Sequence, residues 1–184
     1  LTDPSYAGQI VCFTFPHIGN VGANGDDMEA KNTAVRGLIV KARPTAPSNY
    51  RSATPLPDWL AARGIVGLAG IDTRRLARMI REHGMPNGVI AHDPEGQFDI
   101  DALTAEAKAW PGLEGMDLAK DVTTTQTHDW TETPWQWNAG YAAREGAAKF
   151  KVVAMDFGIK SNILRELAGI GADVMVVPAS ATAE

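Results

Sequence analysis

The chain has 184 residues, of which 45% are hydrophobic and 21% are charged, and its formal net charge is −5 at pH 7. This composition is typical of a globular protein, and the acidic balance gives no electrostatic reason to expect nucleic acid or an anionic membrane as a partner. The single cysteine excludes an internal disulfide framework and a zinc site built on paired cysteines, and no apolar run approaches the roughly 18 residues that span a bilayer, so we expect a cytoplasmic protein.

Short strands separated by loops are predicted for the first part of the chain. Residues 9–15 and 35–41 are apolar and partly β-branched, and the segment between them is rich in Gly, Asn and Asp, which favours a loop. A short helix over 56–63 follows and stops at Gly64. A strand of small residues is predicted over 65–71.

The clearest helix covers residues 72–83. Asp72 can cap its first amide groups, and Gly84 can adopt the left-handed turn that ends it. Its periodicity predicts one buried apolar stripe and one exposed basic face, which is either a docking surface for an acidic or anionic partner or, as we favour, a solvated outer surface. The two sets are Leu76, Met79 and Ile80, and Arg74, Arg78 and Arg81. A strand over 88–92 and a helix over 101–110 follow.

The pattern changes in the last third of the chain. Residues 123–149 contain no Leu, Ile, Val, Met or Phe, so this segment is predicted to be a linker whose tryptophans contact a neighbouring domain. A strand, a helix and a second strand follow within 30 residues, which predicts a βαβ unit with parallel strands. These elements are expected over 150–155, 159–168 and 172–177. One such unit cannot cover its own sheet, so we expect this domain to continue beyond Glu184.

Few residues carry a chemical signature. Cys12 lies within an apolar strand, where a small buried hydrophobe is favoured over a catalytic thiol, although His17 is only five residues away. The four histidines lack the spacing of metal ligands, so no metal site is predicted. The segment from Asp156 to Lys160 joins a strand to a helix and could offer amide groups to an anion, but it lacks the pattern of a nucleotide-binding loop. These residues alone indicate an α/β protein without an assignable activity.

Five stretches, taken together and in order, resemble the small, glutamine-hydrolysing subunit of carbamoyl phosphate synthetase. They are LTDPSYAGQIV (1–11), PHIGNVG (16–22), GIDTRRLAR (70–78), PGLEGMDLA (111–119) and DFGIKSNIL (156–164). Each is weak alone, but five in the family's order across nearly the whole chain are specific. The sequence is identified as an N-terminal fragment of a member of this family.

The resemblance implies a domain organisation. Residues 1–122 would form an N-terminal swivelling domain of β/β/α type that lacks its first strands, 123–149 a linker, and 150–184 the opening βαβ unit of a class I glutamine amidotransferase domain. The family's subunit hydrolyses glutamine and passes ammonia to a large subunit, its partner, for carbamoyl phosphate synthesis in arginine and pyrimidine biosynthesis. ATP and magnesium are used by that large subunit, so no cofactor is expected in this chain. The catalytic Cys, His and Glu are expected beyond Glu184.

One site residue follows from the resemblance. The serine of the family's Thr-Asp-Pro-Ser-Tyr motif contacts the bound L-glutamine, and it corresponds to Ser5 here. A hydroxyl can accept from an ammonium group or donate to a carboxylate. Without the resemblance, Ser5 is the polar position of an Asp-Pro-Ser turn. An alternative function for the chain is a non-catalytic interaction module that keeps the N-terminal fold, although an open sheet edge at the end of the chain argues against it.

Overall fold

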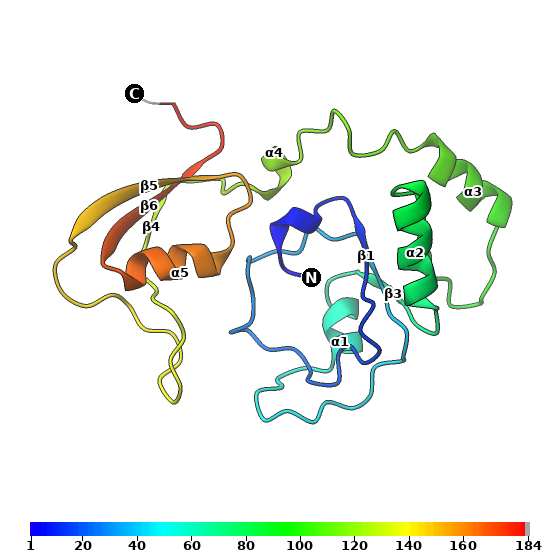
Figure 1. Cartoon of the computed structure of the whole chain (residues 1–184), viewed down its shortest axis with the longest axis horizontal. Helices are drawn as coiled ribbons and strands as arrows, with labels where there is room; N and C mark the ends of the chain where they lie inside the picture. Colours follow the sequence, from blue (N-terminus) through cyan, green and yellow to red (C-terminus); the bar gives the residue numbers. More distant parts are fainter. Residues whose placement is uncertain (183–184) are drawn as a thin grey trace. The chain divides into compact units, whose positions relative to one another are not determined.

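A computed structural model describes residues 1–182 of the chain, and these residues divide into two compact units. The first unit contains Leu1–Ala7, Gly25–Ala34 and the chain from Asp117 on, and the second contains Gly8–Asn24 and Val35–Met116. Both combine helices with a small sheet, which agrees with the predicted α/β class (Figure 1). The domain limits drawn from the sequence, and the two named domain types, remain predictions.

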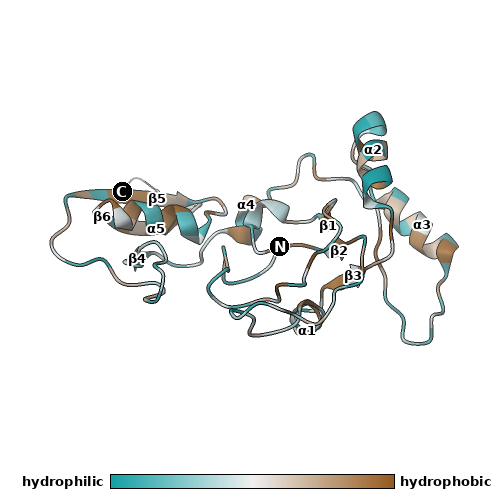
Figure 2. Cartoon of the chain, turned by 60° about the horizontal axis from the view of Figure 1, so that its bottom comes forward, coloured by the Kyte–Doolittle hydropathy of each residue, from teal (hydrophilic) through white to brown (hydrophobic). Residues whose placement is uncertain are grey.

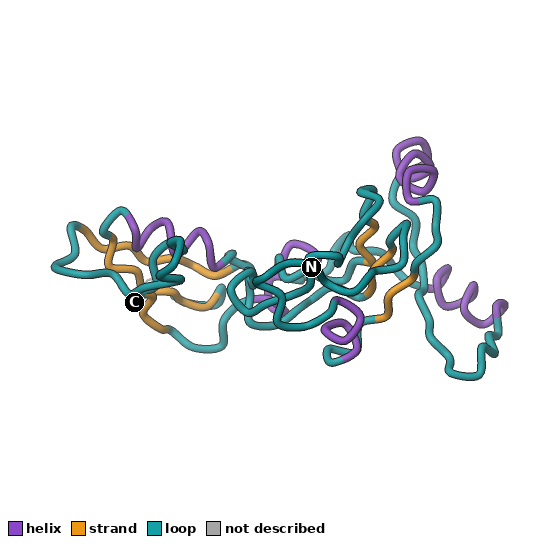
Figure 3. Tube along the Cα trace, turned by 90° about the horizontal axis from the view of Figure 1, so that it is seen from below, coloured by secondary structure: helices purple, strands orange, loops and turns teal. Residues whose placement is uncertain are grey.

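The sheet of the second unit consists of three short parallel strands, drawn in orange in Figure 3. These are β1 (Ile10–Cys12), β2 (Gly37–Ile39) and β3 (Val66–Leu68). β2 is central, with Leu38 opposite Val11 on one side and opposite Gly67 on the other. The three predicted strands are thus confirmed, each in a shorter form. Because neighbouring strands follow one another in the chain and are all parallel, a crossover is needed between β1 and β2 and between β2 and β3, which explains the long loops of this unit.

The core of the second unit lies around β2 and α1 (Leu56–Ala61). Leu38 is 1% exposed, and Trp59 and Leu60 of α1 are also buried. α1 lies beside β3, and the Arg63 guanidinium stands 4.2 Å from the centre of the Trp59 ring, so a cation covers the outer side of this aromatic residue.

Helix α2 (Thr73–His83) begins and ends as the sequence predicts. The Asp72 Oδ1 atom accepts a hydrogen bond from the Arg75 amide at 3.0 Å, and Gly84 ends the helix with a φ of 85°. The cap satisfies one of the amide groups that have no partner within the helix.

The predicted faces of α2 are only partly correct. Arg74, Arg78 and Arg81 are exposed, as expected. Met79, which was predicted to be buried, is 48% exposed, and Leu76 and Ile80 are half-buried. Figure 2 shows how hydrophilic this helix is. Periodicity identifies the side of a helix that faces the protein, but it does not determine how much neighbouring structure covers that side.

The strand predicted over residues 88–92 is absent from the structure. The segment has no strand partner, and instead the Ile90 side chain lies over Gly37, where a Cβ would stand 2.7 Å from its Cγ2. Helix α3 (Ile100–Ala109) follows, capped by Asp99, whose Oδ1 accepts from the Ala102 amide at 2.9 Å. The predicted helix over 101–110 is therefore confirmed to within one residue.

The sheet of the first unit confirms the predicted βαβ arrangement. It consists of β4 (His128–Trp130), β5 (Phe150–Asp156) and β6 (Ala172–Pro178), in the order β4-β6-β5. β5 and β6 are parallel, whereas β4 runs antiparallel to β6. Helix α5 (Ser161–Gly169) connects β5 to β6 and packs on one face of the sheet (Figure 1).

A compact apolar cluster joins α5 to this sheet. Its buried members are Leu164, Ala172, Val174 and Val176, and Trp130 of β4 packs against them. Strand β4 comes from the segment predicted as a linker, which also holds Trp137 at 67% exposed. The short helix α4 (Ala119–Val122) precedes this segment. The tryptophans of this segment therefore differ: Trp130 completes the core of the sheet, whereas Trp137 faces solvent.

Two further observations concern residues 1–182. None of their helices has both the length and the apolar character needed to cross a membrane. No group of three or more His, Cys, Asp or Glu side chains within these residues is placed to hold a metal ion.

Candidate functional site

Ser5 lies on η1 (Pro4–Tyr6), a single 3₁₀ turn built by the Thr-Asp-Pro-Ser-Tyr motif. The Asp3 Oδ1 atom caps the turn and accepts from the Ser5 amide at 2.9 Å, while the Tyr6 amide donates to the Asp3 carbonyl at 3.1 Å. Pro4, whose ring fixes its own φ, is buried, whereas Ser5 is exposed. The motif therefore presents the serine from a turn that the local sequence makes rigid.

Asp3 connects Ser5 to a positive charge. Its carboxylate receives hydrogen bonds from both the backbone and the side chain of Ser5, and its Oδ2 atom lies 3.5 Å from the Lys160 Nζ. Burial raises the pKa of the Asp3 carboxyl, but the hydrogen bonds from Ser5 and the charge of Lys160 outweigh this effect and leave the pKa below its ordinary value. Asp3 is therefore ionised at neutral pH, and the Ser5 hydroxyl directs its proton toward it.

Glu29 holds this turn near the start of α5. Its amide donates to the Thr2 Oγ1 at 3.0 Å, and its carbonyl accepts from the Ser161 amide at 2.8 Å and from the Ser161 hydroxyl at 3.1 Å. Its carboxylate accepts from the Asn162 amide at 3.1 Å. One residue of the 25–34 segment thus joins the Ser5 motif to the first residues of α5 within the first unit.

In the turn from Asp156 to Lys160, whose amide groups could in principle have met an anion, two amide groups donate to a protein acceptor. The Gly158 and Ile159 amides donate to the Asp156 Oδ1 at 2.9 and 2.8 Å. At the start of α5, the Ser161 and Asn162 amides donate to Glu29. The Gly158 and Ile159 amides are therefore occupied by a protein carboxylate, and the turn supports the Ser5 motif through Lys160.

Cys12, the single thiol, lies on β1 in the second unit and is half-buried. Its Sγ lies 3.9 Å from the Thr73 carbonyl oxygen, and burial raises the pKa of the thiol. Within residues 1–182, no hydrogen bond joins it to His17. A catalytic thiol needs a nearby base or a lowered pKa, so this geometry agrees with the predicted non-catalytic side chain, although Cys12 is half-buried and not fully buried as expected.

Cys12 should therefore react slowly with alkylating reagents. Because burial holds the pKa of the thiol above its ordinary value, the thiolate forms at a higher pH in the folded chain than in the unfolded chain. Iodoacetamide should alkylate the folded chain more slowly than the urea-unfolded chain at every pH between about 7 and 9. Mass spectrometry of timed samples measures both rates. Equal rates, or faster alkylation of the folded chain, would contradict this account.

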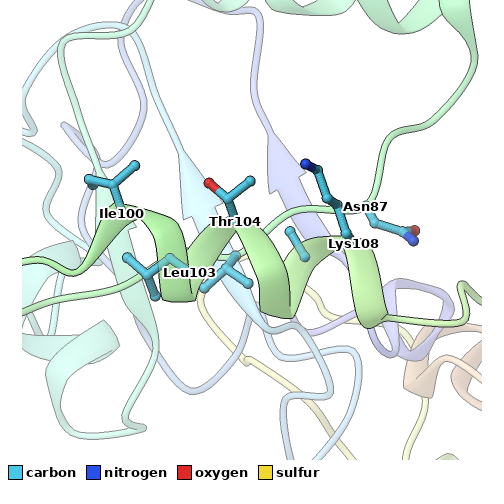
Figure 4. Close-up of a pocket in the computed structure, with 7 residues that line it drawn as sticks. Asn87, Ile100, Leu103, Thr104 and Lys108 are labelled. Carbon is cyan, nitrogen blue, oxygen red and sulfur yellow. The ribbon is translucent and has the colours of Figure 1, made fainter.

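A separate pocket of about 620 Å³ lies beside α3 in the second unit. Figure 4 shows Ile100, Leu103, Thr104 and Lys108 projecting from the helix, with Asn87 on the neighbouring segment. Val89 and Ala107 complete the lining. The lining contains no His, Cys, Asp or Glu, and the Asn87 side chain already donates to the Trp110 carbonyl at 2.7 Å. The pocket thus offers mainly apolar contact, together with the Thr104 hydroxyl and the Lys108 ammonium group but without a carboxylate, imidazole or thiol.

The residues that support Ser5 were not identified from the sequence. Asp3, Glu29 and Lys160 are far apart in the chain and form no recognisable motif with one another. Only the folded chain brings them together. Asp156 had one local signal, because an Asp two residues before a Gly is typical of a turn in which the side chain caps the backbone. The sequence therefore identifies the Ser5 motif and the 156–160 turn separately, but it does not reveal that the two are in contact.

Comparison with known proteins shows which proteins the chain resembles. Residues 1–90 match the family described as "Carbamoyl-phosphate synthase small chain, CPSase domain". The whole chain is 60% identical to the carbamoyl phosphate synthase small chain of Rhizobium meliloti, 57% identical to that of Caulobacter vibrioides and 60% identical to that of Brucella ovis.

The alignments cover 100% of this chain but only 47%, 48% and 46% of these three relatives. The chain thus spans about half the length of the curated relatives that it matches. The resemblance seen in five short stretches extends over every part of the chain, and the prediction drawn from them is confirmed: along its whole length the chain is similar to carbamoyl phosphate synthase small chains.

Proposed function

We propose that this chain is part of a small subunit that hydrolyses glutamine and supplies ammonia to a large subunit for carbamoyl phosphate synthesis. The observation that carries the proposal is the identity of 57–60% with carbamoyl phosphate synthase small chains along its whole length. The domain types belong to this proposal: a swivelling domain, then the start of a class I amidotransferase domain. The proposal also includes a cytoplasmic location and the use of ATP and magnesium by the large subunit alone.

Within this proposal, Ser5 binds the substrate glutamine. Its exposure leaves room for a ligand, and its rigid turn lowers the entropic cost of holding the hydroxyl in place. The hydroxyl donates to the ionised Asp3, which places a negative charge directly beside the serine oxygen. An oxygen beside a carboxylate suits a cation, and we therefore propose that Ser5 accepts a hydrogen bond from the α-ammonium group of glutamine.

The nucleophile is proposed to lie outside residues 1–184. Glutamine hydrolysis needs an activated nucleophile, and the half-buried Cys12 with its raised pKa does not supply one. Residues 1–184 would then contribute substrate contacts and the surface for the large subunit, while the rest of the subunit contributes the bond-breaking groups.

The activity assay compares the complete protein with residues 1–184 alone. The complete protein, assembled with its large subunit, should release glutamate and ammonia from glutamine, and residues 1–184 should release neither. Ammonia release by the short chain that is lost in Cys12→Ala would show that the nucleophile is Cys12. Absence of glutamine hydrolysis by the complete assembly would instead support the alternative, a non-catalytic interaction module.

A further inference from the structure

Asp156, the last residue of β5, is a buried carboxylate that serves three backbone amides. Asp156 is only 7% exposed. Oδ1 accepts from the Gly158 and Ile159 amides at 2.9 and 2.8 Å, and Oδ2 accepts from the Thr124 amide at 2.6 Å. A buried charge is tolerated when hydrogen bonds of this kind satisfy it. Asp156 thus joins two chain segments, the 158–159 turn and the stretch that follows α4.

The 158–159 turn lies against the motif that carries Ser5. Gly158 has a φ of +93°, and a Cβ placed on it would stand 3.0 Å from the Pro4 Cβ and 2.9 Å from the Val122 Cγ2. The Gly158 backbone therefore lies in direct contact with the ring of Pro4 and with the end of α4. Two residues further along the chain, the Lys160 Nζ lies 3.5 Å from the Asp3 Oδ2.

A continuous set of contacts therefore leads from Asp156 to Ser5. The carboxylate fixes the turn, Gly158 of the turn supports Pro4, and Lys160 faces Asp3, which in turn caps the Ser5 amide. Because Pro4 and Asp3 flank Ser5 on its N-terminal side, a shift of the turn displaces the serine hydroxyl. A displacement of about 1 Å can cost up to about a hundredfold in the use of a substrate.

We infer that Asp156 is a positioning residue for glutamine binding: it holds the 157–160 turn against Asp3 and Pro4 and so determines where the Ser5 hydroxyl lies. This inference rests on the proposed function, because it assumes that Ser5 contacts glutamine. Asp156 itself touches no substrate, since both of its oxygens are occupied by backbone amides.

The test uses Asp156→Asn in the complete protein assembled with its large subunit. Asparagine keeps the shape but replaces one acceptor oxygen by an NH₂ group, which repels the amide that it faces. We expect the KM for glutamine to rise about 3- to 30-fold, with a smaller change in kcat, while synthesis from free ammonia stays unchanged. Asp129→Asn, at an exposed carboxylate on β4 of the same sheet, is the matched control and should change the KM by less than about twofold.

A double-mutant cycle with Ser5→Ala separates positioning from a merely structural role. If Asp156 acts through Ser5, the double variant should have the same KM as Ser5→Ala alone. The inference would be overturned if the KM of the double variant rose by the product of the two single increases, or if Asp156→Asn left the KM unchanged. Either result would leave the proposed function intact. An unchanged KM in Ser5→Ala would refute the glutamine-binding role of Ser5, and the positioning role would fall with it.

Gly158→Ala provides the same test if Asp156→Asn does not accumulate as folded protein. The added methyl group meets Pro4 and Val122, so it displaces the same turn without removing a buried charge. It should raise the KM for glutamine about 3- to 30-fold and leave ammonia-dependent synthesis unchanged. A normal KM in Gly158→Ala would overturn the positioning role.

Discussion

Replacing Ser5 by alanine in the complete protein should weaken the use of glutamine about 10- to 150-fold, since a hydrogen bond to a charged group contributes roughly 1.5–3 kcal/mol. The substitution removes the hydroxyl that donates to Asp3 and that, in the proposed function, accepts from the ammonium group of glutamine. It leaves the turn itself in place, because the Ser5 amide still donates to the Asp3 Oδ1. Steady-state kinetics with glutamine as the nitrogen source measure the loss in kcat/KM.

Two controls make the Ser5→Ala result specific. Synthesis from free ammonia bypasses the glutamine site and should be nearly unchanged. Ser180→Ala removes an exposed serine hydroxyl elsewhere in the first unit and should leave glutamine kinetics within about twofold of those of the wild type. If Ser5→Ala also stays within about twofold, Ser5 is a turn residue, and the role inferred from the family motif is wrong.

Replacing Leu38 by alanine should lower the free energy of unfolding by about 2–5 kcal/mol. Leu38 is 1% exposed at the centre of β2, between two other strands, and alanine leaves a cavity there that neighbouring side chains cannot fill without shifting. Urea unfolding followed by tryptophan fluorescence measures the change, since the buried Trp59 reports on the same core.

Met79→Ala is the matched comparison for Leu38→Ala. Both substitutions remove a large apolar side chain from the second unit, but Met79 is 48% exposed on α2. Its loss should cost no more than about 0.5 kcal/mol. A greater loss of stability in Met79→Ala than in Leu38→Ala would mean that α2 is covered in solution and that its predicted buried face is correct after all.

Local signals made most of the fold predictable. The βαβ unit was recognised because its apolar strands and its helix differ in periodicity, and α2 because Asp72 and Gly84 mark its two ends. Residues 88–92 were misassigned because strand propensity does not reveal whether a pairing partner exists. Met79 was misassigned because amphipathic spacing does not reveal what lies opposite the helix.

The candidate site was predictable only in part, for a related reason. Ser5 was found through a short motif whose residues are adjacent in sequence. Its support comes from Glu29, Asp156 and Lys160, which reach it only after folding. Separations of more than 100 residues leave no trace in local propensity, and a buried carboxylate such as Asp156 resembles any other aspartate in the sequence.

The most direct test of the account is a crystal structure of the complete protein with a non-hydrolysable glutamine analogue bound. The account predicts that the Ser5 Oγ lies at a hydrogen-bond distance of about 2.5–3.2 Å from the ammonium nitrogen of the analogue, with Asp3 still capping the Ser5 turn. An analogue bound in the active site without contact to Ser5 would contradict it.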